Sequence, residues 1–265
     1  MRLAFRLSYF GTHFSGSQMQ RDLRTVEGEF IGACQRLELF SDWRAAGFST
    51  AGRTDRGVHS RGQVVALTTD LPERAVQALN AQLPRDAWCT GWATVPDAFH
   101  PRYDARSRTY RYYFPFLPED LHAMQKAAGL FLGTHDFSNF ARASDRNPVR
   151  TVLAISVETL DDSAYLQVTA ESFLWNQVRR MAAVLLEIGS GIRETESIEG
   201  LFKSPASACP SAAPPEGLIL WDVDCGISWN PLPVDPKSAE YCFDLLNYHR
   251  TMETVSRIIG RPDIS

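Results

Sequence analysis

Hydrophobic and polar positions alternate with period two in some segments of the chain and recur with helical spacing in others. Leu3, Phe5, Leu7 and Tyr9 alternate with smaller or polar neighbours, which predicts a half-buried strand over residues 2–10. The same two periods predict helices near 26–40, which Thr25 can cap, and 73–83, and strands near 47–51, 63–69, 88–95 and 107–114.

The second part of the chain repeats this order of elements. Helices are predicted near 120–132, 174–188 and 196–203, and strands near 151–159, 164–171 and 217–224. The shared order predicts an α+β fold with two similar halves of ferredoxin-like type. These halves would join through a central mixed, mainly antiparallel sheet on which the helices pack. The chain then divides into residues 1–115, 116–225 and a helical C-terminal extension of unknown role, 226–265.

The composition favours a folded chain with a sizeable core, since 44% of the 265 residues are apolar. No apolar run approaches the ~20 residues needed to cross a bilayer, and the alternating N-terminus lacks the apolar stretch of a signal peptide. The five cysteines include no C-x-x-C pair, and the six histidines show no metal-ligand spacing. We therefore expect a cytoplasmic protein without a membrane segment, a disulfide framework or a metal.

Charge is unevenly distributed along the chain. The net charge of −4 argues against a nucleic-acid binder. Residues 1–150, however, carry 19 Lys and Arg against 15 Asp and Glu, whereas residues 151–265 carry 8 against 16. The first part is therefore the better candidate for a surface that binds a polyanion.

The segment 51–60 holds the most informative group of polar residues. Gly52 and Gly57 bracket a loop in which Asp55 lies close to two arginines, and a histidine follows. A carboxylate beside a cation keeps a low pKa, which suits a nucleophile or a base. The cationic neighbours would contact phosphate or a flipped nucleotide; they are Arg53, Arg56 and His59. The alternative interpretation is a solvated Gly-Asp turn with a local ion pair.

Arginine and aromatic residues interleave over residues 99–114. On a strand, Arg108, Tyr110 and Tyr112 would share one face, and Arg111 would lie on the other. Tyr110 could stack against an unpaired base while Arg108 and Arg111 neutralise phosphates. The alternative is an ordinary strand with its aromatic side chains in the core.

A cation also lies beside the apolar stripe of the helix predicted near 174–188. Arg179 follows Trp175 by one turn and is half-turned toward that stripe. Such a cation usually needs a carboxylate partner, and Asp55 is one candidate. A snorkelling surface arginine is the alternative.

Together these segments resemble the TruA family of tRNA pseudouridine synthases, over roughly residues 1–224. The matching motifs occur in the family's order along the chain. They are Phe10-Gly11 with Gly16-Ser17-Gln18, Gly52-Arg53-Thr54-Asp55 with Gly57-Val58-His59, Ala78-Leu79-Asn80 with Leu83-Pro84, Phe99-His100, Arg108-Thr109-Tyr110-Arg111-Tyr112, His135-Asp136-Phe137, Phe173-Leu174 with Val178-Arg179, and Pro214 with Gly217-Leu218.

The resemblance implies a two-part α+β fold and a homodimer that binds the anticodon arm of tRNA. It further implies isomerisation of uridines 38, 39 and 40 without a metal or an organic cofactor. By position, Asp55 matches the family's catalytic aspartate, Tyr110 its active-site tyrosine and Arg179 the arginine that pairs with the aspartate. Arg53 matches the arginine associated with flipping the target base.

The chain departs from the family at three positions: Ser17 stands where Trp is frequent, Arg56 where Ala is frequent and Gln177 where Met is frequent. Ser17 and Arg56 could alter how the RNA is held. Two other classes of protein are compatible with the sequence. One is an inactive RNA-binding module; the other is an aspartate-dependent hydrolase of a small phosphorylated substrate, although no carboxylate cluster for its metal is evident.

Overall fold

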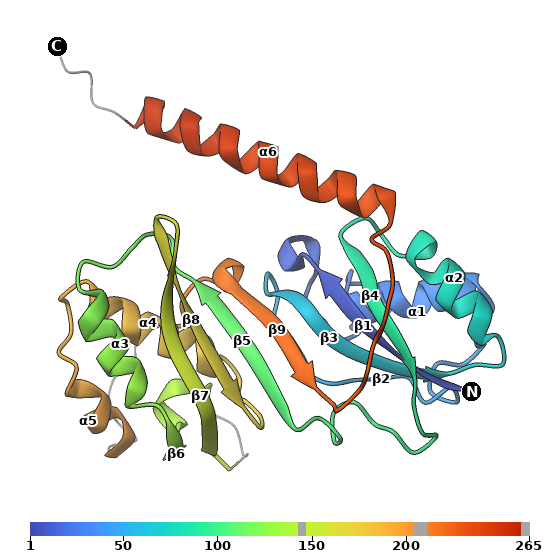
Figure 1. Cartoon of the computed structure of the whole chain (residues 1–265), viewed down its shortest axis with the longest axis horizontal. Helices are drawn as coiled ribbons and strands as arrows, with labels where there is room; N and C mark the ends of the chain where they lie inside the picture. Colours follow the sequence, from blue (N-terminus) through green and yellow to red (C-terminus); the bar gives the residue numbers. More distant parts are fainter. Residues whose placement is uncertain (143–146, 204–210, 261–265) are drawn as a thin grey trace.

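A computed structural model describes residues 1–142, 147–203 and 211–260. These residues form one ten-stranded sheet with helices packed on it (Figure 1). Its strand order is β10-β4-β1-β3-β9-β5-β8-β7-β6, with β2 pairing with β3 beside this path. The strands are β1 (Arg2–Tyr9), β2 (Ser49–Thr50), β3 (His59–Thr68), β4 (Ala87–Thr94), β5 (Ser107–Tyr113), β6 (Gly133–Asp136), β7 (Val149–Leu160), β8 (Ser163–Ala170), β9 (Leu218–Asp224) and β10 (Asn230–Pro231).

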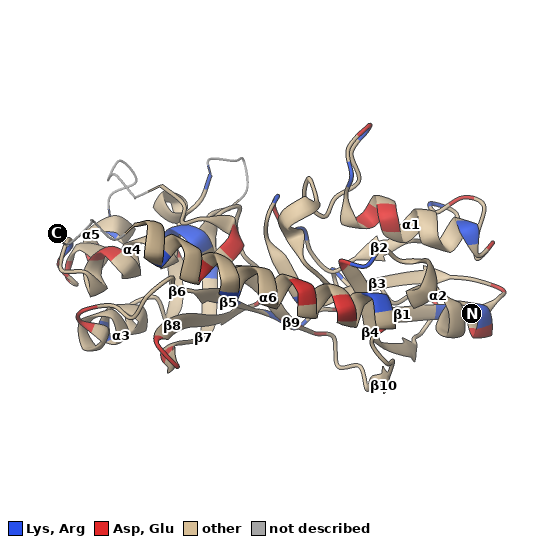
Figure 2. Ribbon diagram, turned by 90° about the horizontal axis from the view of Figure 1, so that it is seen from above, with Lys and Arg blue, Asp and Glu red and all other residues tan. Residues whose placement is uncertain are grey.

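All helices except α6 lie toward the two ends of this sheet, whereas α6 extends along the length of the molecule (Figures 1 and 2). They are α1 (Val26–Arg36), α2 (Pro72–Gln82), α3 (Leu121–Gly129), α4 (Gln177–Gly189), α5 (Ser197–Lys203) and α6 (Pro236–Ile259), with short 3₁₀ turns η1 (Gly11–His13), η2 (Ser138–Phe140) and η3 (Pro215–Gly217). α1 and α2 cover the first part of the sheet, and α3, α4 and α5 belong to the second (Figure 2).

The first core forms because the alternating side chains of β1 meet the apolar faces of α1 and α2. Leu3, Phe5 and Leu7 are almost completely buried against this layer. α1 begins at the predicted cap: the Thr25 hydroxyl accepts a hydrogen bond from Gly28 N–H (3.2 Å). The strand alternation and the start of this helix are therefore confirmed.

A second core packs α3 and α4 against β5, β7 and β8. α4 begins at Gln177, three residues later than predicted. Asn176 has a left-handed backbone (φ 66°), and the Gln177 side-chain oxygen accepts from Leu174 N–H (2.9 Å), so the preceding residues form a capped turn instead.

The junction between the two parts is made by β9. It pairs with β3 in parallel, through His59–Ile219 and Ser60–Leu220, and with β5 in antiparallel orientation. The other described strand pairs are antiparallel. The predicted α+β class with a mixed, mainly antiparallel sheet is confirmed.

The strand predicted at 63–69 begins earlier, at His59, and two short strands, β6 and β10, were not predicted. The polar start of β3 and its Gly62 have the composition of a loop. Gly62 is required there because a Cβ would lie 2.7 Å from Trp221 O, where β9 approaches.

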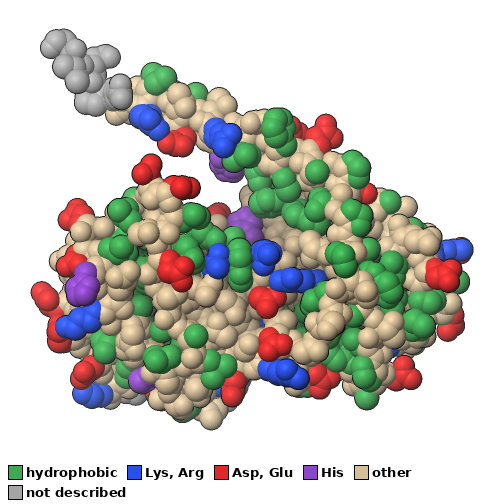
Figure 3. Space-filling model, in the orientation of Figure 1, with side chains coloured by type: hydrophobic (Ala, Val, Ile, Leu, Met, Phe, Trp, Pro, Cys, Tyr) green, Lys and Arg blue, Asp and Glu red, His purple; other side chains and the backbone are tan. Residues whose placement is uncertain are grey.

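The start of the C-terminal extension is anchored to the first part of the sheet. β10 pairs with β4, and the Lys237 ammonium donates to the carbonyls of Asn80 (3.0 Å) and Ala81 (2.7 Å). Tyr241 is 8% exposed and meets Phe10 edge to face. Beyond it α6 extends away from the sheet (Figure 1) and carries exposed apolar side chains (Figure 3). Apolar residues recur on it at spacings of three and four; they are the half-buried Leu245 and the exposed Tyr248, Met252, Val255 and Ile259.

Among the described residues, no helix is long and apolar enough to span a membrane. The same residues contain no cluster of three His, Cys, Asp or Glu side chains that could hold a metal ion.

Candidate active site

The loop that carries Asp55 is fixed at the residue before it. Ser17 Oγ accepts a hydrogen bond from Thr54 N–H (2.8 Å), and Ser17 N–H donates to Thr54 O (3.0 Å). The Thr54 hydroxyl lies 2.7 Å from the Tyr9 hydroxyl at the end of β1. Ser17, Thr54 and Tyr9 are all buried. The departure from the family at Ser17 thus holds the loop from inside the protein.

The other side of this loop is held by close packing. Gly57 has φ 84°, and a Cβ there would lie 2.9 Å from the ring of Pro215 in η3. His59 Nδ1 accepts a hydrogen bond from Gly11 N–H (3.1 Å), and burial lowers the pKa of His59. This histidine, which was predicted to contact RNA, links η1 to the start of β3 through its ring.

Arg179, in the first turn of α4, faces Asp55 across the site. Its Nη1 lies 3.9 Å from Asp55 Oδ2, so the two side chains form an ion pair that is not bidentate. The guanidinium is held by Ala213 O, to which Nε donates (2.6 Å), and by Asn176 Oδ1, to which Nη1 donates (3.2 Å). The left-handed backbone of Asn176 therefore helps to aim this cation at the carboxylate.

Burial raises the pKa of Asp55 above its ordinary value of 3.8, although the Arg179 charge and a hydrogen bond from the Trp175 side chain act in the opposite direction. The expectation that adjacent Arg53 and Arg56 would lower this pKa is wrong. Both arginines are exposed. Solvent screens exposed charges, so desolvation of the half-buried carboxylate has the larger effect.

Tyr110 lies on β5 between Val168 of β8 and Leu220 of β9. Its ring meets that of Phe173 edge to face, with centroids 5.2 Å apart. Burial strongly raises the pKa of Tyr110, and the nearby Asp55 charge adds to this effect. The phenol is therefore protonated at neutral pH beside the carboxylate.

The four arginines predicted to meet RNA have different surroundings. Arg53 and Arg56 are exposed on either side of Asp55, and neither forms an ion pair or hydrogen bond with a described residue. Arg108 donates to four backbone carbonyls, at 2.6–3.3 Å; they belong to Ala51, Arg102, Ala105 and Glu171. Arg108 therefore links the segment before the Asp55 loop to residues 102–105, which precede β5, and to Glu171, which follows β8.

Arg111 lies on the face of β5 opposite Tyr110. Its guanidinium stacks on Trp221 (3.6 Å) and Tyr165 (4.7 Å), and its Nε donates to Gln167 (2.8 Å). The structure therefore brings Asp55, Tyr110 and Arg179 together, with Arg53 and Arg56 at the margin, and leaves Arg111 on the other side of the sheet.

Two contributors to the site were not predicted. Thr54, with its partners Tyr9 and Ser17, fixes the backbone beside Asp55, and the Trp175 side chain acts to lower the pKa of the carboxyl. These contacts join segments far apart in the sequence. The only local signal was the position of Trp175 one turn before Arg179.

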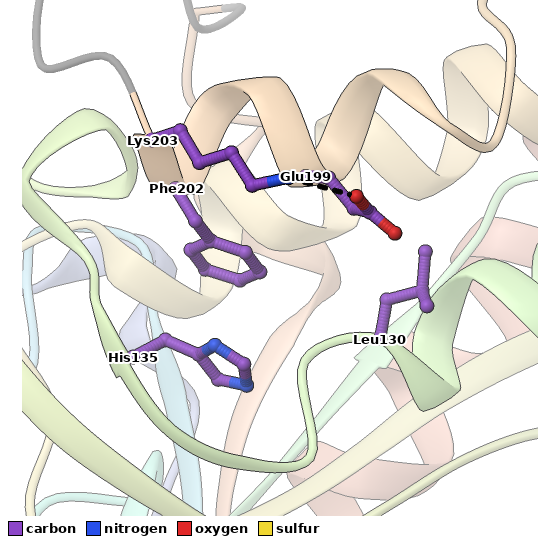
Figure 4. Close-up of a pocket in the computed structure, with 5 residues that line it drawn as sticks. All are labelled: Leu130, His135, Glu199, Phe202 and Lys203. Carbon is purple, nitrogen blue, oxygen red and sulfur yellow. Dashed lines mark hydrogen bonds and ion pairs between the residues drawn. The ribbon is translucent and has the colours of Figure 1, made fainter.

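A separate hollow lies among α3, β6 and α5 (Figure 4). Phe202 stacks on His135 there, with ring centroids 4.3 Å apart, and Lys203 pairs with Glu199 along the same helix. These elements are not the ones that carry Asp55, Tyr110 and Arg179.

The chain is similar to several known proteins. A family model described as tRNA pseudouridine synthase matches residues 127–224. The tRNA pseudouridine synthase A of Methanoculleus marisnigri is 59% identical over 256 residues, covering 97% of this chain and 94% of the relative. That of Methanosphaerula palustris is 52% identical, covering 100% and 94%. A solved structure of the archaeal box H/ACA sRNP Nop10-Cbf5 complex matches with a TM-score of 0.38 and 13% identity, covering 72% of this chain and 43% of that one.

The family model and the curated relatives agree on the class of protein, a pseudouridine synthase. The curated relatives then narrow it: the chain belongs to the tRNA pseudouridine synthase A family, and it is an isomerase. The resemblance to the TruA family is thereby confirmed.

Proposed function

We propose that this enzyme isomerises uridine to pseudouridine at positions 38, 39 and 40 of the tRNA anticodon stem-loop, with Asp55 as its essential carboxylate. One observation carries this proposal: a half-buried carboxylate lies between a fixed arginine and a protonated tyrosine, 3.9 Å from the Arg179 guanidinium. The exposed Arg53 and Arg56 flank it, where a polyanionic backbone can reach them.

The reaction breaks the C1′–N1 bond, turns the uracil, forms the C1′–C5 bond and removes the proton from C5. The target base must leave its stack before any side chain can reach these atoms. Asp55 could attack the sugar, attack the uracil or remove a sugar proton, and each role requires the ionised carboxylate. Arg179 favours that form and orients it.

Tyr110 is proposed to stack on the uracil. Because burial raises the pKa of Tyr110, a tyrosinate is scarce at neutral pH, so the residue suits stacking better than removal of the C5 proton. Arg53 is proposed to occupy the space left by the flipped base, and Arg56 to contact phosphate. Arg108 is assigned a positioning role, because its donors are directed at backbone carbonyls.

We further propose a homodimer in the cytoplasm that needs no cofactor, built from two ferredoxin-like halves (1–115 and 116–225) and the extension 226–265. The exposed apolar stripe of α6 supports the dimer, because a repeat with spacings of three and four suits packing against another helix. Removing residues 248–265 should therefore lower the molar mass measured by light scattering from dimer to monomer. The melting temperature should fall by the contribution of dimerisation and lose its dependence on protein concentration, while the body stays folded because the anchor at Tyr241 remains. A truncated chain that is still dimeric would contradict this role for α6.

The activity is tested with unmodified tRNA transcripts, followed by site-resolved mapping of pseudouridine. Product should appear at positions 38–40 and disappear when those uridines are replaced by cytidine. Asp55→Asn should bind the transcript normally and form no product. Binding by the wild-type protein without any product would instead indicate an inactive RNA-binding module.

A further inference from the structure

Trp175 is unusual among the side chains around Asp55 because much of it is exposed. It lies between β8 and α4 and is 50% exposed, whereas its neighbour Leu174 is 8% exposed. Its side chain is close enough to Asp55 to favour the ionised form of that carboxyl, which lowers its pKa. An indole near the reacting carboxylate with half its surface exposed is accessible to a ligand that approaches Asp55.

A cation is held against this indole by a segment distant in the sequence. The Arg142 guanidinium lies 4.1 Å from the centroid of the Trp175 ring, and Arg142 N–H donates to Trp175 O (3.0 Å). The hydrogen bond between their backbones fixes the distance between the two residues, and the side chain of Arg142 is exposed. The pair therefore offers an aromatic surface and a positive charge side by side.

We propose that Trp175 and Arg142 form an RNA-binding subsite, in which an unpaired nucleobase next to the target uridine stacks on the indole while Arg142 contacts its phosphate. The inference rests on the proposed function, because it takes the occupant to be the substrate RNA. The proximity of Trp175 to Asp55 supports that occupant, since RNA bound at the carboxylate also comes within reach of the exposed indole.

The chemistry of the pair fits a loop nucleotide better than a paired one. Single-stranded RNA is bound by stacking its bases on aromatic side chains or guanidinium planes. Such stacking tolerates any base, so the subsite would position the RNA without reading its sequence. A flipped uridine leaves its neighbours partly unstacked, which makes an adjacent base available.

The chain contains a matched control. Arg44 lies 4.3 Å over the ring of Trp43, in the same kind of contact, and its side chain is exposed. That loop packs at the far end of β3, where Thr68 N–H donates to Ala46 O. The Asp55 loop precedes the near end of the same strand, roughly 30 Å away at ~3.3 Å per residue.

The test measures binding of an anticodon stem-loop RNA by fluorescence anisotropy at several salt concentrations. Trp175→Ala should weaken binding roughly 5- to 150-fold, the range for loss of one stacked base, without changing the salt slope. Arg142→Ala should weaken binding and lower the slope by about one unit. Arg44→Ala should leave affinity and slope unchanged.

Trp175→Phe separates the two roles of the indole and covers the possibility that Trp175→Ala does not fold. Phenylalanine keeps an aromatic surface but has no N–H, so affinity should stay within about threefold of the wild type. The acidic limb of the pH–rate profile should move to higher pH, because Asp55 loses a hydrogen bond to its ionised form. If Trp175 and Arg142 only pack against each other, Trp175→Phe should leave the acidic limb in place and Arg142→Ala should leave the salt slope unchanged.

A series of RNAs with single abasic sites identifies the stacked nucleotide. At one position, removal of the base should weaken wild-type binding and abolish the further effect of Trp175→Ala, as a double-mutant cycle requires. If every abasic RNA still responds fully to Trp175→Ala, or if Trp175→Ala binds normally, the subsite is refuted. A wild-type protein that forms no pseudouridine at positions 38–40, while Trp175→Ala still weakens binding, would refute the proposed function and retain the subsite.

Discussion

Replacement of Asp55 by asparagine should abolish activity while leaving the folded state as stable as before, or slightly more stable. The ionised carboxylate is 37% exposed and lies 3.9 Å from Arg179. At that separation the attraction is about 1 kcal/mol in water and about 4 kcal/mol near a protein surface, and exposure places this pair toward the lower value. Desolvation of Asp55 outweighs it, since the net effect is a raised pKa.

The sign of the stability change follows from this raised pKa. A carboxyl group with a higher pKa in the folded state stabilises that state while it is protonated, below its pKa in the unfolded chain. This contribution is lost as the pH rises through the folded-state pKa. At neutral pH the charged Asp55 is therefore a net cost to the fold. Asparagine removes the cost, and Arg179 keeps its hydrogen bonds to Ala213 and Asn176.

The expected change in the free energy of unfolding at pH 7 is between zero and about +1 kcal/mol, or up to about 2 °C in melting temperature. The difference should shrink as the pH falls through the folded-state pKa of Asp55, because the wild-type carboxyl then becomes protonated. Activity should fall by at least about 10²- to 10⁴-fold. The rate is measured as tritium released from tRNA labelled at C5 of uridine, and stability by thermal unfolding at several pH values.

Two results would refute this reasoning. A loss of several kcal/mol in Asp55→Asn at pH 7 would mean that the carboxylate supports the fold through a strong ion pair, contrary to its raised pKa. Substantial turnover by the folded variant would remove Asp55 from the chemistry. The variant Asp22→Asn is a suitable control, because that residue is an exposed carboxylate paired only with exposed Arg21.

Three further predictions concern the same site. Arg179→Lys should slow turnover by about 10- to 100-fold and destabilise the protein by about 1–2 kcal/mol, because lysine cannot reproduce the guanidinium's bonds to Ala213 and Asn176; wild-type kinetics would contradict this. The acidic limb of kcat/KM should lie above pH 3.8 and rise further in Arg179→Gln, which removes the cation that favours ionised Asp55; a limb at or below 3.8 would exclude Asp55 as its source. Arg56→Ala should weaken tRNA binding and lower the salt slope by about one unit, with the rate at saturating tRNA largely unchanged; an unchanged slope would mean that Arg56 does not contact phosphate.

Elements of the fold could be predicted from the sequence where the burial of one face makes apolar residues recur with a regular period. β1 and the first helix followed from alternation and from a capping threonine, since one face of each must be buried. The place of β9 could not be found in this way. Its parallel ladder with β3 consists of two residue pairs, and that register depends on where two separate segments meet in space.

The arginines show the same limit more sharply. Arg108 and Arg111 lie on one strand and were both predicted to contact phosphate, yet one donates to backbone carbonyls and the other stacks on Trp221. Alternation along β5 separates their faces, but only the tertiary partners decide whether a guanidinium has donors to spare. Composition identifies basic segments; it does not show which cations are already engaged.

The Asp55 loop could be recognised from its residues, but the pKa of Asp55 could not be predicted from them. Its sequence neighbours Arg53 and Arg56 suggested a stabilised anion, whereas the groups that act on the carboxylate are Arg179 and Trp175, from a distant segment. The hydrogen bonds of Thr54 with Ser17 and Tyr9 hold the loop in a position where burial disfavours the negative charge of Asp55. A carboxylate held charged against its preference is a stronger base or nucleophile than one at its ordinary pKa, provided that it is ionised at the working pH. The buried hydrogen bonds of Thr54 and the Arg179 guanidinium therefore act together on Asp55. The hydrogen bonds keep the carboxyl group desolvated, and Arg179 keeps part of it ionised.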